Sequence, residues 1–119
     1  MKTVHRFGAQ GDVIFIKREA LPKDAKPVEY GKELIVAHSK TGHHHVIDRP
    51  TPAVALFADA TNPLISYLQI KGRAVADVVH LRDFDAHETI RLDAGKDDSV
   101  WEIRRQREYD PVAERRVMD

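Results

Sequence analysis

Apolar and polar residues alternate along most of this chain, in short runs that end at glycine, proline or aspartate. A period of two places successive side chains on opposite faces, which is typical of β-strands with one buried face. The runs are also rich in valine and isoleucine, which favour strands. We therefore expect eight or nine short strands, within residues 3–7, 13–17, 33–39, 43–47, 53–58, 65–71, 73–80, 87–92 and 100–108.

The breaks between these runs predict loops, a kink and one helix start. The segment 21–27 holds two prolines, which remove backbone donors, so it can form neither a helix nor a central strand. Gly72 predicts a bulge or kink between two strands. Asp110 followed by Pro111 has the pattern of a helix start. The chain is thus predicted to be all-β, a single domain over residues 1–119 that forms a small barrel or roll with a short C-terminal helical turn.

Length and composition narrow the class of protein. The chain has 119 residues, 42% hydrophobic and 32% charged, as expected for one soluble domain. It has no cysteine, which excludes disulfides and thiolate ligands. Its 19 basic and 19 acidic residues cancel, which argues against nucleic-acid binding without closing that alternative. No apolar run approaches the roughly 18 residues of a membrane span. The N-terminus also lacks a signal-peptide core, so we expect a cytoplasmic protein with no membrane partner.

The seven histidines, three of them consecutive, are the most unusual feature of the composition. On a strand, His43 and His45 would share one face and His44 would take the other. His80 ends one predicted strand and His87 begins the next, so a hairpin would bring their Cβ atoms to about 5 Å. Imidazole is the commonest protein ligand for zinc, iron and nickel. We predict that His43, His45, His80 and His87 bind a divalent transition metal, zinc first, with iron or nickel as alternatives.

The sequence leaves open whether this metal is structural or catalytic, and hence whether the chain is an enzyme. A closed set of four imidazoles would be structural, while three imidazoles and a water, or two and a carboxylate, would also fit. In a catalytic site, Glu88 or Asp85 would be the general base acting on metal-bound water. The remaining histidines are expected to have other roles: His38 in the core, His44 solvated or supporting a ligand, and His5 on the surface.

Near the C-terminus, apolar and basic residues alternate in a dense segment. Trp101 and Ile103 would share one face and are predicted to be buried. The arginines that follow have planar forks that suit phosphates. Nucleic-acid binding is therefore one alternative function, through Arg104, Arg105, Arg107, Arg115 and Arg116. Because acidic residues are interleaved with them, we favour cross-strand pairing of these arginines with carboxylates.

Together these motifs resemble those of a family of small uncharacterised bacterial and phage proteins. The similarity lies in the GDV strand, the segment GHHHV, the later histidine pair and the terminal RRQREYDP with R-x-V-x-D, and it covers residues 11–119. The resemblance implies that His43 and His45 are the G-H-x-H histidines and that His80 and His87 are the later pair. It also implies that the four form one unit, although the later pair is farther apart here than in the family.

The resemblance implies no particular activity, so a second class of function stays open. The chain would then be an interaction or structural module that acts as a homo-oligomer, with contacts made by its edge strands and terminal segment. A large interface, with the histidines dispersed among different environments, would distinguish this module from a metal-binding protein.

Overall fold

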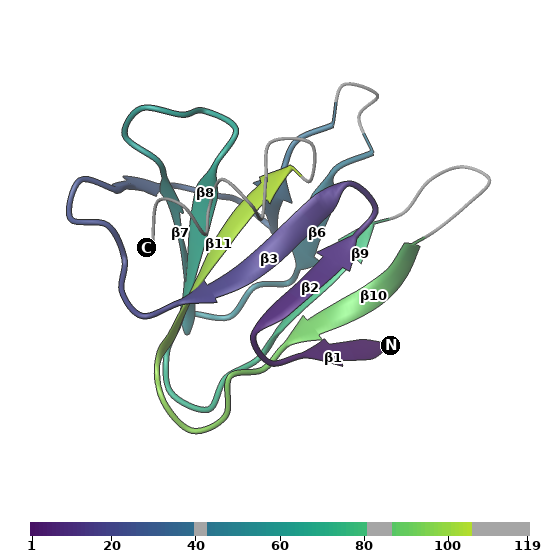
Figure 1. Cartoon of the computed structure of the whole chain (residues 1–119). Helices are drawn as coiled ribbons and strands as arrows, with labels where there is room; N and C mark the ends of the chain where they lie inside the picture. Colours follow the sequence, from purple (N-terminus) through teal and green to yellow (C-terminus); the bar gives the residue numbers. More distant parts are fainter. Residues whose placement is uncertain (40–42, 81–86, 106–119) are drawn as a thin grey trace, which may run out of the picture.

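The computed structural model describes residues 1–39, 43–80 and 87–105, which form two β-sheets (Figure 1). The strands within these ranges are β1 Lys2–Val4, β2 Phe7–Gln10, β3 Val13–Arg18, β4 Lys26–Val28, β5 Glu33–Ala37, β6 His45–Asp48, β7 Val54–Ala58, β8 Ser66–Ile70, β9 Ala76–His80, β10 His87–Leu92 and β11 Ser99–Arg105. The five-stranded sheet has the order β1-β10-β9-β6-β5, and the six-stranded sheet has the order β2-β3-β11-β8-β7-β4. All the strand pairs are antiparallel except β1 with β10.

The apolar core lies between the two sheets and draws on both. In β9 the period of two is plain, because Ala76, Val78 and His80 are buried and the residues between them are not. In β3, by contrast, the first four residues are all buried. A strand covered on both faces has this continuous apolar sequence, and VIFI in β3 is an example. The sequence therefore predicted most strands correctly, because the burial of one or both faces of a strand determines whether its apolar residues alternate or are continuous.

The all-β prediction is confirmed, but the barrel is wrong. No pairing among the described residues joins the edge strands, which are β1 and β5 in one sheet and β2 and β4 in the other. The sheets remain open and pack face to face because the chain repeatedly changes sheet between strands. Gly72, with a φ of +59°, lies in one such link between β8 and β9 rather than at a bulge in a ladder. The helical turn predicted to begin at Asp110 lies outside the described residues. A search of the described residues found no candidate membrane-spanning helix.

The predicted strand over residues 3–7 is two strands, which lie in different sheets. The chain turns a corner at residues 5–6, and the backbone at Gly8 comes close to the Val4 side chain. A Cβ added at Gly8 would lie 2.5 Å from a methyl carbon of Val4, so only glycine fits without movement. This corner joins β1 to β2 and closes one side of the sandwich. At the opposite side, residues 29–32 join β4, an edge strand of one sheet, to β5, an edge strand of the other.

A cross-strand ion pair gives a first test of the register. Arg91 on β10 faces Asp77 on β9, with Nε–Oδ1 at 2.8 Å and Nη2–Oδ2 at 3.0 Å. The Arg91 hydrogen bond holds the pKa of the Asp77 carboxyl below its usual range. A carboxyl whose folded pKa is lowered adds stability above its unfolded pKa and loses it as pH falls through the folded value.

We expect Asp77→Asn to destabilise the protein slightly at pH 7 and by less at pH 3, because the contribution of the ion pair decreases as pH falls through the lowered folded pKa of Asp77. The effect is small because both side chains are more than a third exposed and water screens the pair. Urea unfolding of both proteins at the two pH values measures the difference. An equal loss of stability at both would show that the ion pair is not its cause.

Candidate functional site

Three of the predicted ligand positions lie in one row across neighbouring strands. His45 begins β6, His80 ends β9 and His87 begins β10. In the ladders, His80 is paired with His45 on one side and with His87 on the other. The predicted hairpin between β9 and β10 is therefore confirmed for the backbone. The side chain of His87 lies outside the described part of the chain, so its role as a ligand stays a prediction.

The rings of His45 and His80 lie face to face. Their centroids are 3.7 Å apart and their planes differ by 20°. Both side chains project from the core face of their sheet, and the residues are only 1% and 6% exposed. One member of the first histidine pair thus meets one member of the later pair. The rule that alternate residues of a strand share one face (the face rule) predicted this contact for His43 as well as for His45.

His43 takes a different position from the one that the face rule gives it. That rule needs a strand, and β6 begins only at His45. The contact of His43 with this cluster is made by its backbone, whose carbonyl oxygen lies 2.9 Å from Nε2 of His80. Because a carbonyl can only accept, Nε2 of His80 carries a hydrogen. The prediction that the His43 ring is a metal ligand is not tested by this contact.

Gln10, at the end of β2, ties the histidines to the opposite sheet. Its Nε2 donates to the carbonyl oxygens of Val78 at 2.8 Å and Glu88 at 3.0 Å. Its Oε1 accepts from Nδ1 of His45 at 2.8 Å. Since the amide nitrogen must face the two carbonyls, the oxygen must face the ring, which assigns the hydrogen to Nδ1 of His45. When the His45 ring is neutral, its lone pair is therefore on Nε2.

The cluster continues from His45 to an ion pair near the surface. Asp12 Oδ1 lies 3.9 Å from His45 Nε2, and Asp12 Oδ2 accepts from Arg105 Nη1 at 2.8 Å. Partial burial acts to raise the pKa of the Asp12 carboxyl, but the hydrogen bond and charge of Arg105, a backbone hydrogen bond and His45 together lower it. Arg105 Nη2 also donates to the carbonyl oxygen of His38. The side of His45 that carries Nε2 therefore faces an anionic carboxylate.

Sequence reasoning missed both Gln10 and Asp12. The sequence signal at Gln10 was misleading, because alternation in the run Phe7–Gln10 favours Phe7 and Ala9 as the inward residues, whereas the structure buries Gly8 and Gln10. A polar residue at an inward position must find partners, since burying it unpaired is costly. Asp12 gave no comparable signal, because an aspartate after a glycine is an ordinary turn residue.

The predicted roles of the other polar residues are partly confirmed. Where the structure describes the arginines of the C-terminal segment, they do pair with carboxylates, but not as predicted across strands of the C-terminal half. Arg104 contacts Glu102 on its own strand at 3.3 Å, and Arg105 contacts Asp12, from the N-terminal part of the chain, at 2.8 Å. Arg107 and Asp85 lie outside the described residues. Glu88, considered above as a general base, is 3.1 Å from the N-terminal ammonium.

The prediction that His38 belongs to the core is wrong. β5 ends at Ala37, so the alternation of buried residues stops before His38, which is exposed. Its ring lies edge-on to that of His44, with centroids 5.0 Å apart. His44 Nδ1 accepts from the backbone N–H of Ser39 at 2.8 Å, so this ring supports the local backbone.

No complete metal site is present within the described ranges. There, no group of three or more histidine, aspartate and glutamate side chains is arranged to hold an ion. The stacking explains this result for His45 and His80, because the lone pairs of two nearly parallel rings cannot both point at one ion.

Comparison with known proteins identifies a family. No curated protein matches this chain, and no solved structure does. One family profile matches residues 9–106, a range that includes Gln10, Asp12 and both stacked histidines. Because this match covers well over half of the 119 residues, the chain belongs to the family described as a domain of unknown function, DUF8820.

Proposed function

We propose that this protein binds one divalent transition-metal ion, zinc first, at the end of the sandwich where His45 and His80 meet. Two imidazoles in contact and a carboxylate, that of Asp12, 3.9 Å from one of them are donors of the kind that zinc and ferrous iron take. His43 and His87 flank this point along the chain and are the further ligands of the four-histidine set.

The hydrogen bonds of the two rings carry the proposal. A metal-binding imidazole usually donates its second N–H to a protein acceptor, which fixes the tautomer and the orientation of the ring. His45 donates Nδ1–H to Gln10, and His80 donates Nε2–H to the carbonyl of His43. In its neutral form, each ring would then have its lone pair on the other nitrogen, Nε2 of His45 and Nδ1 of His80, and these are the atoms that would bind the ion.

Binding requires the two rings to leave the stacked arrangement. A ring turn at His80 would exchange the stacking contact, worth about 0.5–1.5 kcal/mol, for a metal bond. Zinc binding at a full set of protein ligands is worth about 10 kcal/mol or more at neutral pH. The cost of unstacking is thus small beside the gain, and the stack does not prevent the site from forming.

Zinc titration of metal-free protein, purified without a nickel column, tests the proposal. We expect one equivalent to bind, and His45→Ala and His80→Ala each to weaken binding by more than about 100-fold. Calorimetry gives the stoichiometry and affinity, and a thermal melt shows whether each variant is folded. His43→Ala and His87→Ala show which of the flanking histidines completes the set.

His5→Ala is the matched control for this titration. His5 lies at the β1–β2 corner, where Nδ1 contacts the carbonyl oxygen of Asp93 at 2.8 Å. Its removal should leave zinc affinity unchanged. The proposal fails if folded His45→Ala and His80→Ala proteins bind zinc as tightly as the parent, or if the parent takes up no stoichiometric ion.

A further inference from the structure

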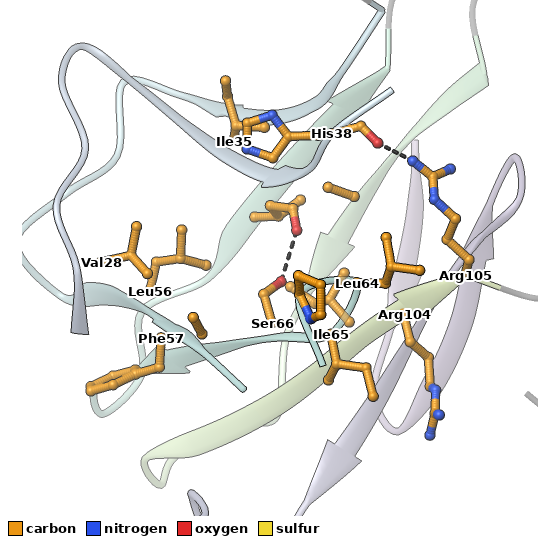
Figure 2. Close-up of a pocket in the computed structure, with 15 residues that line it drawn as sticks. Val28, Ile35, His38, Leu56, Phe57, Leu64, Ile65, Ser66, Arg104 and Arg105 are labelled. Atoms are coloured by element: carbon orange, nitrogen blue, oxygen red, sulfur yellow. Dashed lines mark hydrogen bonds between the residues drawn. The ribbon is translucent and has the colours of Figure 1, made fainter. Parts of the chain in front are cut away.

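A cavity of about 180 Å³ lies between the two sheets, on the side away from the β1–β2 corner (Figure 2). Its walls come from β5, β7, β8, β11 and the loop before β8. The apolar side chains that shape it include Ile35, Leu56, Phe57, Leu64, Ile65 and Ile103. At its mouth, Val28 is 37% and Leu64 47% exposed, which is unusual for large apolar residues.

The wall formed by the loop before β8 is held in place by an aspartate. Asp59 Oδ1 accepts from the hydroxyl of Tyr67 at 2.7 Å, and Oδ2 accepts from the backbone N–H groups of Thr61 and Asn62. The Tyr67 hydrogen bond, followed by these backbone contacts, lowers the pKa of the Asp59 carboxyl. Leu64 therefore lies on a fixed loop, and the cavity is formed before any ligand arrives.

The charged groups that line the cavity are all basic. Arg104 and Arg105 line it together with His38, and no aspartate or glutamate is among its lining residues. Figure 2 shows the Arg105 side chain reaching along the edge of the cavity to the His38 carbonyl, whereas Arg104 extends in the opposite direction. The guanidinium of Arg105 has five N–H donors. Its contacts with the described residues Asp12 and His38 use two of them. An anion in the cavity would meet the others.

The edge strand beside the cavity is closed to a partner strand. Ser66 Oγ donates to the carbonyl oxygen of Val36 at 2.8 Å, and Arg105 donates to that of His38. A strand added beside β5 would need these carbonyls as acceptors. Since side chains from the opposite sheet already bind them, the cavity suits a small molecule better than an extended peptide.

We infer that this cavity binds a small organic anion with an apolar body, of the class of aromatic or branched aliphatic carboxylates. The apolar walls would hold the body, and the guanidinium of Arg105 would donate to the carboxylate in a charge-assisted hydrogen bond. A dry cavity of about 150 Å³ holds benzene in another protein, so a single six-membered ring fits the size found here. The inference does not depend on the proposed metal, whose ligands do not line this cavity.

Binding of benzoate, with benzyl alcohol as the neutral probe of equal shape, tests the inference. We expect benzoate to bind with a dissociation constant on the order of 0.1–1 mM, at least about tenfold tighter than benzyl alcohol. NMR titration of labelled protein measures both affinities and maps the shifts. The shifts should centre on Ile35, Leu64 and Ile103.

Two variants distinguish the contribution of the Arg105 charge to binding from that of the cavity volume. Arg105→Gln should reduce benzoate affinity to that of benzyl alcohol, and Ala58→Leu, which fills the cavity, should remove binding of both probes. Arg91→Gln, an arginine outside the cavity, should change neither. Should Arg105→Gln fail to fold, the parent's preference for benzoate and the Ala58→Leu result still decide the question. Equal binding of the two probes by the parent, shifts away from the cavity, or full affinity in Ala58→Leu would each overturn the inference.

Discussion

Trp101→Ala should lower the free energy of unfolding by about 3–5 kcal/mol, the largest effect that we expect from one substitution. Trp101 is 0% exposed and is the largest fully buried side chain among the described residues. It lies on β11, paired with Lys17 on β3 and Leu68 on β8. Its Nε1 also donates to Ser99 Oγ at 3.0 Å. Truncation would remove apolar contacts with both sheets and leave a cavity that these strands cannot close.

A matched variant separates the ring volume from the hydrogen bond. Trp101→Phe keeps most of the apolar surface and loses only the indole N–H, so we expect it to cost less than half of the alanine effect. Urea unfolding measures all three proteins. Domains of this size are stable by about 5–15 kcal/mol, so the alanine variant should be measured at low temperature. A loss below about 1 kcal/mol for Trp101→Ala would show that the ring does not fill the core as described.

The strands could be predicted from the sequence because their signal is local. The run Val13–Arg18 is apolar over four residues, and the structure places a strand at these residues. The pairing of strands carries no such signal. Arg105 on β11 is paired with Val13 on β3, far away along the chain, and no repeat or spacing connects the two positions. Local alternation therefore could not show whether the sheet closes into a barrel, because closure depends on these long-range strand pairs.

The candidate site was predictable to the same extent. His45 and His80 could each be placed near a strand end from the local pattern, but their contact depends on the pairing of β6 with β9, which that pattern does not carry. Asp12 and Arg105 joined the site only through the tertiary fold, since β3 and β11 bring them to 2.8 Å. The face rule failed at His43 and His38 for one reason, which is that each lies just beyond the strand that was predicted to include it.

Gln10→Ala should lower the free energy of unfolding by about 2–4 kcal/mol, a large effect for a polar side chain. Gln10 is 2% exposed and makes three hydrogen bonds, two to carbonyls of the opposite sheet and one to His45. The bond to Glu88 lies where the register of β10 against β9 shifts, between His87 and Ile90. Removing the amide leaves buried polar groups without partners, and each unsatisfied group costs about 1–3 kcal/mol.

Gln10→Glu tests the direction of these hydrogen bonds, because it keeps the shape and replaces only the donor. A carboxylate can still accept from Nδ1 of His45, but it would face two carbonyl oxygens with no hydrogen between them. We therefore expect Gln10→Glu to destabilise the protein at pH 7 at least as much as Gln10→Ala. Gln69→Ala, at a half-buried position on β8, is the control and should cost less than about 1 kcal/mol. If Gln10→Glu proved as stable as the parent in urea unfolding, the two amide donor bonds could not be what joins β2 to the opposite sheet. The ring of His45 would then be held in place without the amide donor bonds of Gln10.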